Sequence, residues 1–268
     1  MIDITVLGAS GRMGKAIISC ISKSTDCRLV GAVSEDNDPN IGKDIGEILG
    51  LAKKLGISLV DNDDVILKNT DVVIDFTLPS ALDKNLILCS KGLVPMIIGV
   101  TGLDEEQLNL ITETSFKIPI LYERNMSVGV NVLLNMVQNL SKILDSDFDT
   151  EITETHHRHK IDSPSGTAIA IGEAIAKAKN LNFSDIYKPS RINTNTPRSP
   201  NSIGISSIRG GGFIGDHTVS FTSEDESIEI SHHALDRKCF AQGALSAAKW
   251  IADQDPGLYS MNDVLGLK

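Results

Sequence analysis

A dense group of basic and titratable side chains, HHRHK (156–160), lies in the middle of the chain and is followed closely by SGT (165–167). The chain as a whole is acidic, with a formal net charge of −10, and it has only 6 histidines. Histidine changes its charge near neutral pH, and a neighbouring cation favours its neutral form. We therefore expect a site that holds a small dianionic substrate, with one of these histidines and Lys160 as the pair that delivers a proton to it.

A strand is predicted over 151–158, because polar and apolar residues alternate there. Adjacent residues of a regular strand point to opposite faces, so His156 and His157 do not share one cavity while the strand continues. Either the strand ends at these histidines or one of the two imidazoles is structural.

A helix is predicted over 165–179, directly after the turn DSPSG (162–166). Its first free N–H groups come from about Gly166 and Thr167, and together with the helix dipole they favour a carboxylate. The alternative is that Ser165-Gly166-Thr167 only caps this helix.

A purely structural role remains the alternative for each of these titratable groups. A lone histidine in a strand is usually structural, which applies to each histidine of the 156–160 group. The pair His232-His233 and the turn after Arg209 are expected to be structural as well. No metal is expected, because the chain has no H-E-x-x-H or Cys-rich spacing and the cations in HHRHK disfavour another one.

The segment VLGASGRMG (6–14) places glycines at 8, 11 and 14, where a first strand meets a first helix. A turn without Cβ atoms lets backbone N–H groups approach a pyrophosphate, which then rests on the helix N-terminus. Glu35 follows at the end of the second strand, where it can accept from ribose hydroxyls. The alternative is a plain tight turn in an unrelated α/β protein.

The acid pair Glu35-Asp36 predicts a preference for NADH over NADPH, because adjacent carboxylates repel a 2′-phosphate. Arg12 partly offsets this repulsion. The segment Gly99-Val100-Thr101 ends a strand, so it is expected either to line the nicotinamide end of the groove or to be only a strand end before a helix cap at Asp104.

The first 120 residues alternate short apolar strands with helices, a pattern typical of βαβ units. The predicted strands are 4–8, 28–34, 57–61, 71–77, 95–101 and 118–123, and the clearest helices between them are 12–24, 80–91 and 104–115. The fold class is therefore α/β, with a Rossmann-like doubly wound parallel sheet.

The pattern changes after residue 126 to a helix over 127–144 and then mostly strands. Further strands are predicted at 205–210, 217–223 and 227–234, an exposed loop at 189–202, and a last helix at about 237–252. Strands without intervening helices indicate a second α+β domain with a mixed or antiparallel sheet. We expect a dinucleotide-binding domain over 1–126 and a second domain over 127–239.

Composition excludes several classes of protein. A pI near 5.0 and 4% aromatic residues argue against nucleic-acid and anionic-membrane partners. No apolar run approaches the ~20 residues of a membrane span, and the N-terminus is not a signal peptide. Four cysteines without a CxxC pair favour reduced thiols and a cytoplasmic location over disulfides.

The chain resembles the 4-hydroxy-tetrahydrodipicolinate reductase (dihydrodipicolinate reductase) family nearly from end to end. The resemblance is carried by seven segments, of which the fifth is the most specific: GASGRMG (8–14), DFTLPSA (75–81), IGVTG (98–102), NMSVGVN (125–131), ETHHRHKIDSPSGTA (154–168), GGFIGDHTVSF (211–221) and HHALDRKCFAQGAL (232–245).

The resemblance implies that 240–268 completes the first domain and that the second, over 127–239, is a substrate-binding and oligomerisation domain. It also implies roles for individual residues and a homotetramer built on the sheet of the second domain. His156 would be a proton donor or acceptor and Lys160 the proton donor, with His157, Lys160, Gly166 and Thr167 contacting substrate. The nucleotide would lie on Gly8, Ala9, Ser10, Gly11, Arg12, Met13, Glu35, Gly99, Val100, Thr101, Glu123, Arg124, Asn125 and Met126.

Two departures from the family pattern bear on the cofactor. Glu123-Arg124 stands where members usually carry small residues, which leaves backbone contacts as the expected ones there. Members that use both nicotinamides often have an arginine at the position of Asp36, in agreement with NADH as the preferred cofactor and NADPH as the second.

The resemblance implies NAD(P)H-dependent reduction of 4-hydroxy-tetrahydrodipicolinate, a small cyclic imine dicarboxylate, to tetrahydrodipicolinate with loss of water, in lysine and diaminopimelate biosynthesis. Two alternatives remain: an aspartate-type amino-acid dehydrogenase with the same two-domain plan, and a non-catalytic NAD-binding sensor. An aspartate-type dehydrogenase would not explain the HHRHK group, and an NAD-binding sensor would need no proton donor.

Overall fold

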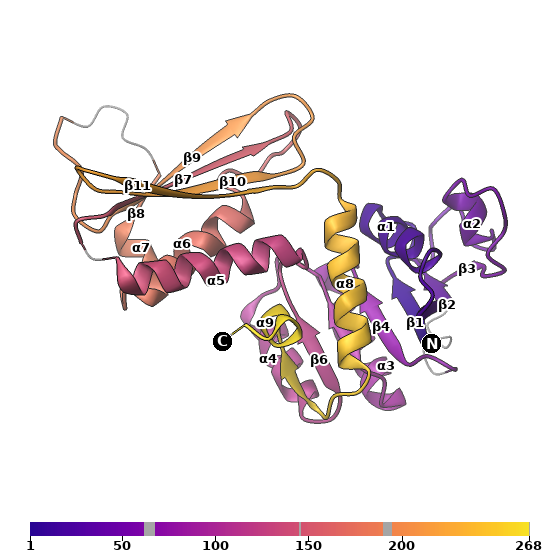
Figure 1. Cartoon of the computed structure of the whole chain (residues 1–268). Helices are drawn as coiled ribbons and strands as arrows, with labels where there is room; N and C mark the ends of the chain where they lie inside the picture. The colour runs from indigo at the N-terminus through magenta and orange to yellow at the C-terminus, as the bar shows by residue number, and fades with distance from the viewer. Residues whose placement is uncertain (62–67, 145, 190–194, 268) are drawn as a thin grey trace. The chain divides into compact units, whose positions relative to one another are not determined.

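The structure, a computed structural model, describes residues 1–61, 68–144, 146–189 and 195–267 (Figure 1). The chain forms two compact units. Unit 1 combines Met1–Val128 with Arg237–Leu267, and unit 2 is the continuous stretch Gly129–Asp236.

Unit 1 contains a seven-stranded parallel sheet in the order β12-β6-β5-β4-β1-β2-β3. Its strands are β1 (Ile2–Leu7), β2 (Cys27–Val33), β3 (Leu59–Val60), β4 (Val72–Asp75), β5 (Met96–Ile98), β6 (Pro119–Tyr122) and β12 (Gly257–Tyr259). The strand order reverses between β1 and β4, where sheets of this kind bind their ligands.

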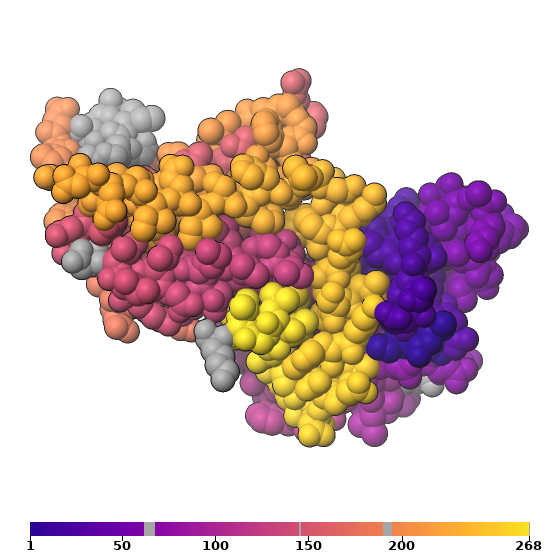
Figure 2. All heavy atoms as spheres, viewed as in Figure 1, coloured from indigo at the N-terminus to yellow at the C-terminus, as the bar shows by residue number. Residues whose placement is uncertain are grey.

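Helices cover both faces of this sheet, so the expected doubly wound α/β architecture is confirmed. The helices are α1 (Arg12–Ile21), α2 (Ile45–Ile48), α3 (Pro79–Gly92), α4 (Glu105–Ser115), α8 (Lys238–Ile251) and α9 (Met261–Leu265). Apolar residues of α1 and α8 pack on one face, and those of α3 and α4 pack on the other. Helices α1 and α8 lie side by side although they come from opposite ends of the chain (Figures 1 and 2).

Unit 2 contains a five-stranded mixed sheet in the order β11-β10-β7-β9-β8. The strands are β7 (Asp149–His156), β8 (Tyr187–Lys188), β9 (Ile203–Arg209), β10 (Asp216–Thr222) and β11 (Ser227–His233), and the helices are α5 (Val128–Ile143), α6 (Gly166–Ala178) and α7 (Phe183–Ile186). Strand β7 runs antiparallel to β10 and parallel to β9. The predicted mixed sheet of an α+β domain is therefore confirmed.

One face of the unit 2 sheet is buried against α5 and α6 through an apolar cluster that includes Leu133, Ile152, Ile171 and Phe221. Strand β7 alternates between buried and partly exposed residues, so Glu154 and His156 lie on this buried face. The predicted loop over 189–202 has no regular structure at 195–202, and residues 190–194 lie outside the described residues.

Candidate active site

Two glycines of the turn after β1, Gly8 and Gly14, leave no room for a Cβ. Gly8 adopts a positive φ of 73°, and a Cβ on Gly14 would lie 2.2 Å from the carbonyl oxygen of Gly8. Helix α1 begins at Arg12 with Gly11 as its N-cap, so no side chain caps its first N–H groups. This cradle fits a pyrophosphate, which would take the place of the missing side-chain acceptor.

Carboxylates surround the end of β2. Glu35 and Asp36 are exposed just after the strand. Asp38 accepts a hydrogen bond from Ser34 (2.9 Å), whose hydroxyl is also bonded to that of Ser10 in the glycine turn (2.8 Å). Hydrogen bonds, first from Ser10 and then from the backbone of Asn40, lower the pKa of Asp38 to about 2. A permanent negative charge is therefore hydrogen-bonded into the turn.

The ends of β5 and β6 carry the remaining residues expected at the cofactor. Gly99 lies against the ring of Phe76, which a Cβ there would approach to 2.3 Å. The Glu123 carboxylate accepts from the backbone N–H groups of Arg124 (3.1 Å) and Met261 (3.4 Å), and burial raises its pKa. The side chain of Glu123 thus holds the start of α9, a structural role that the sequence did not indicate.

All of the residues expected at the cofactor follow the carboxyl ends of parallel strands. The glycine turn follows β1, Glu35 follows β2, 99–101 follows β5, and 123–126 follows β6. Neighbouring parallel strands end at the same edge of a sheet, so the fold brings these segments to one edge of unit 1.

In unit 2, strand β7 ends at His156, and His157 begins the turn that follows. The strand therefore ends between the two histidines, which is one of the two arrangements expected from the sequence. His156 is 8% exposed, whereas His157 is partly exposed.

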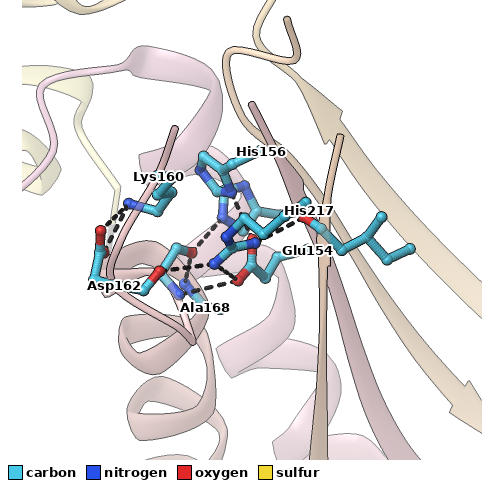
Figure 3. Close-up of polar contacts among 9 residues, drawn as sticks. Glu154, His156, Lys160, Asp162, Ala168 and His217 are labelled. Atoms are coloured by element: carbon cyan, nitrogen blue, oxygen red, sulfur yellow. Dashed lines mark hydrogen bonds and ion pairs between the residues drawn. The ribbon is translucent and has the colours of Figure 1, made fainter. Parts of the chain in front are cut away.

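A fully buried carboxylate, Glu154, supports the His156 ring (Figure 3). Nδ1 of His156 lies 2.5 Å from Oε2 of Glu154, and Arg209 donates to both carboxylate oxygens at 2.8 and 2.7 Å. Burial alone would raise the pKa of Glu154, but hydrogen bonds from Arg209, Ser207 and His156 lower it to about 2. The carboxylate is therefore ionised throughout the physiological range.

His217 completes this buried cluster from the neighbouring strand. Its ring meets that of His156 edge-on at 5.2 Å between centroids, and its Nε2 lies 2.9 Å from Oγ of Ser165. Burial, with a smaller effect from His156, lowers the pKa of His217 to about 4. His217 is thus a neutral neighbour of His156 near pH 7.

Sequence reasoning did not assign a role to Glu154 or His217 and expected a structural role for Arg209. The period of two along a strand could have shown that Glu154 and His156 share a face. The other two residues reach the site through strand pairing, since His217 lies opposite Glu154 and Arg209 lies opposite His156.

Lys160 lies in the loop after β7 and is paired with Asp162. Its Nζ donates to the two carboxylate oxygens at 2.8 and 2.7 Å. Lys160 therefore carries its expected positive charge within an ion pair.

Helix α6 begins at Gly166, and Oγ of Ser165 accepts from the backbone N–H of Ala168 (3.1 Å). Ser165 therefore has the capping role that was one of the two alternatives. Gly166 is exposed at the first helical position, with open space around its Cα, and Thr167 is partly exposed beside it.

Within the described ranges, no group of three or more His, Cys, Asp or Glu side chains is placed to hold a metal ion. All four cysteines are free. None of the helices described is long and apolar enough to cross a membrane.

The doubly wound sheet with its uncapped glycine turn is typical of Rossmann-type NAD(P)-binding proteins, here with a second, mixed-sheet unit. Family models described as dihydrodipicolinate reductase N-terminus and C-terminus match residues 2–126 and 129–265. The chain belongs to the dihydrodipicolinate reductase family.

Curated relatives are similar over their whole length. The chain is 42% identical over 267 residues to the 4-hydroxy-tetrahydrodipicolinate reductase of Nitrosospira multiformis, covering 100% of this chain and 98% of the relative. It is 44% identical to that of Pseudomonas fluorescens (strain SBW25), covering 98% of both.

Solved structures share the fold. A dipicolinate-bound dihydrodipicolinate reductase from Paenisporosarcina sp. TG-14 has a TM-score of 0.77 at 23% identity and covers 97% of both chains. An aspartate dehydrogenase from Thermotoga maritima has a TM-score of 0.51 at 13% identity, covering 95% of this chain and 98% of its own.

Proposed function

We propose that this protein uses a reduced nicotinamide to convert 4-hydroxy-tetrahydrodipicolinate to tetrahydrodipicolinate with loss of water, in lysine and diaminopimelate biosynthesis. The observation that carries the proposal is the similarity of both units, over the full chain, to the dihydrodipicolinate reductase family. The buried His156 beside the Lys160 loop supplies a chemical reason for that activity.

The cofactor would be held along the carboxyl edge of the unit 1 sheet. The glycine turn and the start of α1 would bind its pyrophosphate, Glu35 its ribose hydroxyls, and 99–101 with the backbone of 123–126 its nicotinamide end. When bound, the nicotinamide supplies the hydride. Glu123 would contribute through its backbone, because its side chain accepts a hydrogen bond from the start of α9.

The preferred cofactor would be NADH. Glu35 and Asp36 repel a 2′-phosphate, and the ionised Asp38 adds a third negative charge close to the turn. Arg12 at the start of α1 partly offsets this charge, which leaves NADPH as the second cofactor.

The dianionic substrate would be bound by unit 2. Lys160, His157 and the N–H groups of Gly166 and Thr167 would hold its carboxylates, and Lys160 would exchange Asp162 for the substrate to do so. His156 and Lys160 would supply the proton that the ring requires after hydride transfer.

A homotetramer is part of the proposal. The outer face of the β10–β11 ladder is lined with paired polar side chains, such as Thr218 with Ser231 and Ser220 with Glu229. This outer face of the unit 2 sheet is the surface proposed for assembly. Light scattering of the purified protein tests the expected mass.

A coupled assay tests the activity. Pyruvate and aspartate semialdehyde generate the cyclic substrate enzymatically, and oxidation of each nicotinamide is followed by absorbance. His156→Ala and Lys160→Ala should each lower kcat at least about tenfold while NADH still binds. Unchanged kcat in both variants removes the assigned roles, and activity only on open-chain amino acids favours an aspartate-type dehydrogenase.

A further inference from the structure

The Glu154 carboxylate accepts hydrogen bonds at both of its oxygens, and Ser207 is one further donor to it. Oε2 accepts from Nδ1 of His156 and from Nη1 of Arg209, while Oε1 accepts from Nη2 of Arg209 and the backbone N–H of Ser165 (3.2 Å). An ionised carboxylate only accepts hydrogen bonds. Nδ1 of His156 must therefore carry a hydrogen.

We propose that Glu154, clamped by Arg209, is a positioning residue that holds His156 in the tautomer with Nδ1 protonated, so that Nε2 is the nitrogen that exchanges a proton. The proposal rests on the proposed function, because it assigns the reacting atom of the proposed proton donor. A carboxylate that orients a catalytic imidazole through Nδ1 is a recurring device in acid–base catalysis.

The surroundings of Nε2 agree with this assignment. A Cβ on Gly215 would lie 3.0 Å from Nε2 of His156, so a side chain at this position would crowd that nitrogen. The other histidine in contact, His217, makes its hydrogen bond to Ser165 and not to His156.

Arg209 has a second function in this arrangement. Its charge balances that of the buried Glu154, with which it forms an ion pair of 2.7 Å. Arg209 also donates to the carbonyl oxygen of Asp162 (2.8 Å). The pair therefore holds the loop that carries Lys160 at two points on its C-terminal side, Asp162 and the N-cap Ser165.

Glu154→Gln is the decisive variant, because an amide has only one acceptor oxygen. Its NH₂ group must face either His156 and Nη1 of Arg209, or Nη2 of Arg209 and the N–H of Ser165, and all of these are donors. Glu154→Asp retains the charge with a shorter reach. Glu151→Gln is the matched control, since Glu151 lies on the same strand and is bonded to an arginine (Arg198, 2.7 Å) away from His156.

Imidazole nitrogen NMR of the ligand-free protein reads the tautomer directly, with the His156 signals assigned by their loss in His156→Asn. Wild-type protein and Glu151→Gln should show the Nδ1–H form. Glu154→Gln should lose this form and lower kcat at least about tenfold, while NADH binding is retained. Glu154→Asp should keep part of the Nδ1–H form and part of the wild-type kcat.

An Nε2–H tautomer in the wild type overturns the proposal, and this measurement decides it even where Glu154→Gln fails to fold. Unchanged kcat and an unchanged tautomer in folded Glu154→Gln also overturn it. Wild-type protein with the Nδ1–H form but no reductase activity supports the tautomer assignment while removing the proposed function.

Discussion

Lys160 and Asp162 form a bidentate ion pair, with both oxygens of the carboxylate within 2.8 Å of the ammonium nitrogen. The Asp162 side chain is 61% exposed and that of Lys160 is 19% exposed, so the carboxylate end of the pair is solvated. Exposed ion pairs contribute only about 0–1 kcal/mol, which a substrate carboxylate can replace. Asp162 is thus a weak internal competitor for the proposed substrate.

Asp162→Asn should lower the KM for the cyclic substrate by up to about fivefold, the equivalent of about 1 kcal/mol, with little change in kcat. Steady-state kinetics at constant ionic strength measures this effect. Asp225→Asn, in the turn between β10 and β11, changes the net charge equally and should have no effect. A higher KM in Asp162→Asn would mean that Asp162 positions Lys160 for binding.

Asp36→Ser should raise kcat/KM for NADPH by about fivefold, because it removes a like charge near the 2′-phosphate. The value for NADH should change little. Comparing both nicotinamides in the coupled assay measures the shift, and Asp83→Ser on α3 serves as the charge-matched control. Wild-type protein that uses NADPH tenfold better than NADH refutes the preference itself.

Gly14→Ala should destabilise the protein by at least about 1 kcal/mol and weaken NADH binding, since its Cβ would overlap the backbone of Gly8. At an uncrowded helical position, Gly→Ala raises the free energy of unfolding by about 1 kcal/mol. A decrease at position 14 would therefore indicate crowding of the new Cβ. Urea unfolding and NADH fluorescence titration measure the two effects. Gly212→Ala is the control, because a Cβ there has open space. Equal free energies of unfolding for the two variants would contradict the proposed crowding at Gly14.

The free energy of unfolding should depend on pH through His217. Its pKa is about 4 in the folded protein against 6.5 for an ordinary histidine, so between these values the unfolded chain binds more protons. The stabilisation is complete above pH 6.5 and decreases as the pH falls toward 4. His217→Gln should flatten this slope by up to about 1.4 kcal/mol per pH unit.

Urea unfolding at several pH values between 4 and 7 measures the slope. The exposed His159 offers the control, since His159→Gln should leave the slope unchanged. Parallel pH profiles for wild type and His217→Gln would show that His217 titrates normally in the folded protein.

The longer helices and the buried strands could be predicted from the sequence because each contains at least one full period of its apolar pattern. Helix α5 was expected over 127–144 and spans Val128–Ile143, and α6 was expected over 165–179 and spans Gly166–Ala178. The short elements α2, α7, β8, β12 and α9 were not predicted. Segments of two to five residues are too short for a period, and their structure depends on tertiary contacts.

The residues that surround His156 could be predicted from the sequence only in part. Glu154 is two residues away on the same strand face, so alternation alone could place it beside the imidazole. Arg209 and His217 come from strands more than fifty residues further along, and their positions depend on pairing registers that no local pattern specifies. The pairing of Lys160 with Asp162 depends on the conformation of the loop, which the sequence does not specify either.

The discontinuity of unit 1 has a consequence for synthesis on the ribosome. Unit 2 is continuous, so all of its strands have been translated once residue 236 is reached. The sheet of unit 1 receives its edge strand β12 and its covering helix α8 only after that point. Domains generally fold as units as they emerge, the N-terminal one first. Here unit 1 begins first in translation, but it is complete only after all of unit 2 has been translated.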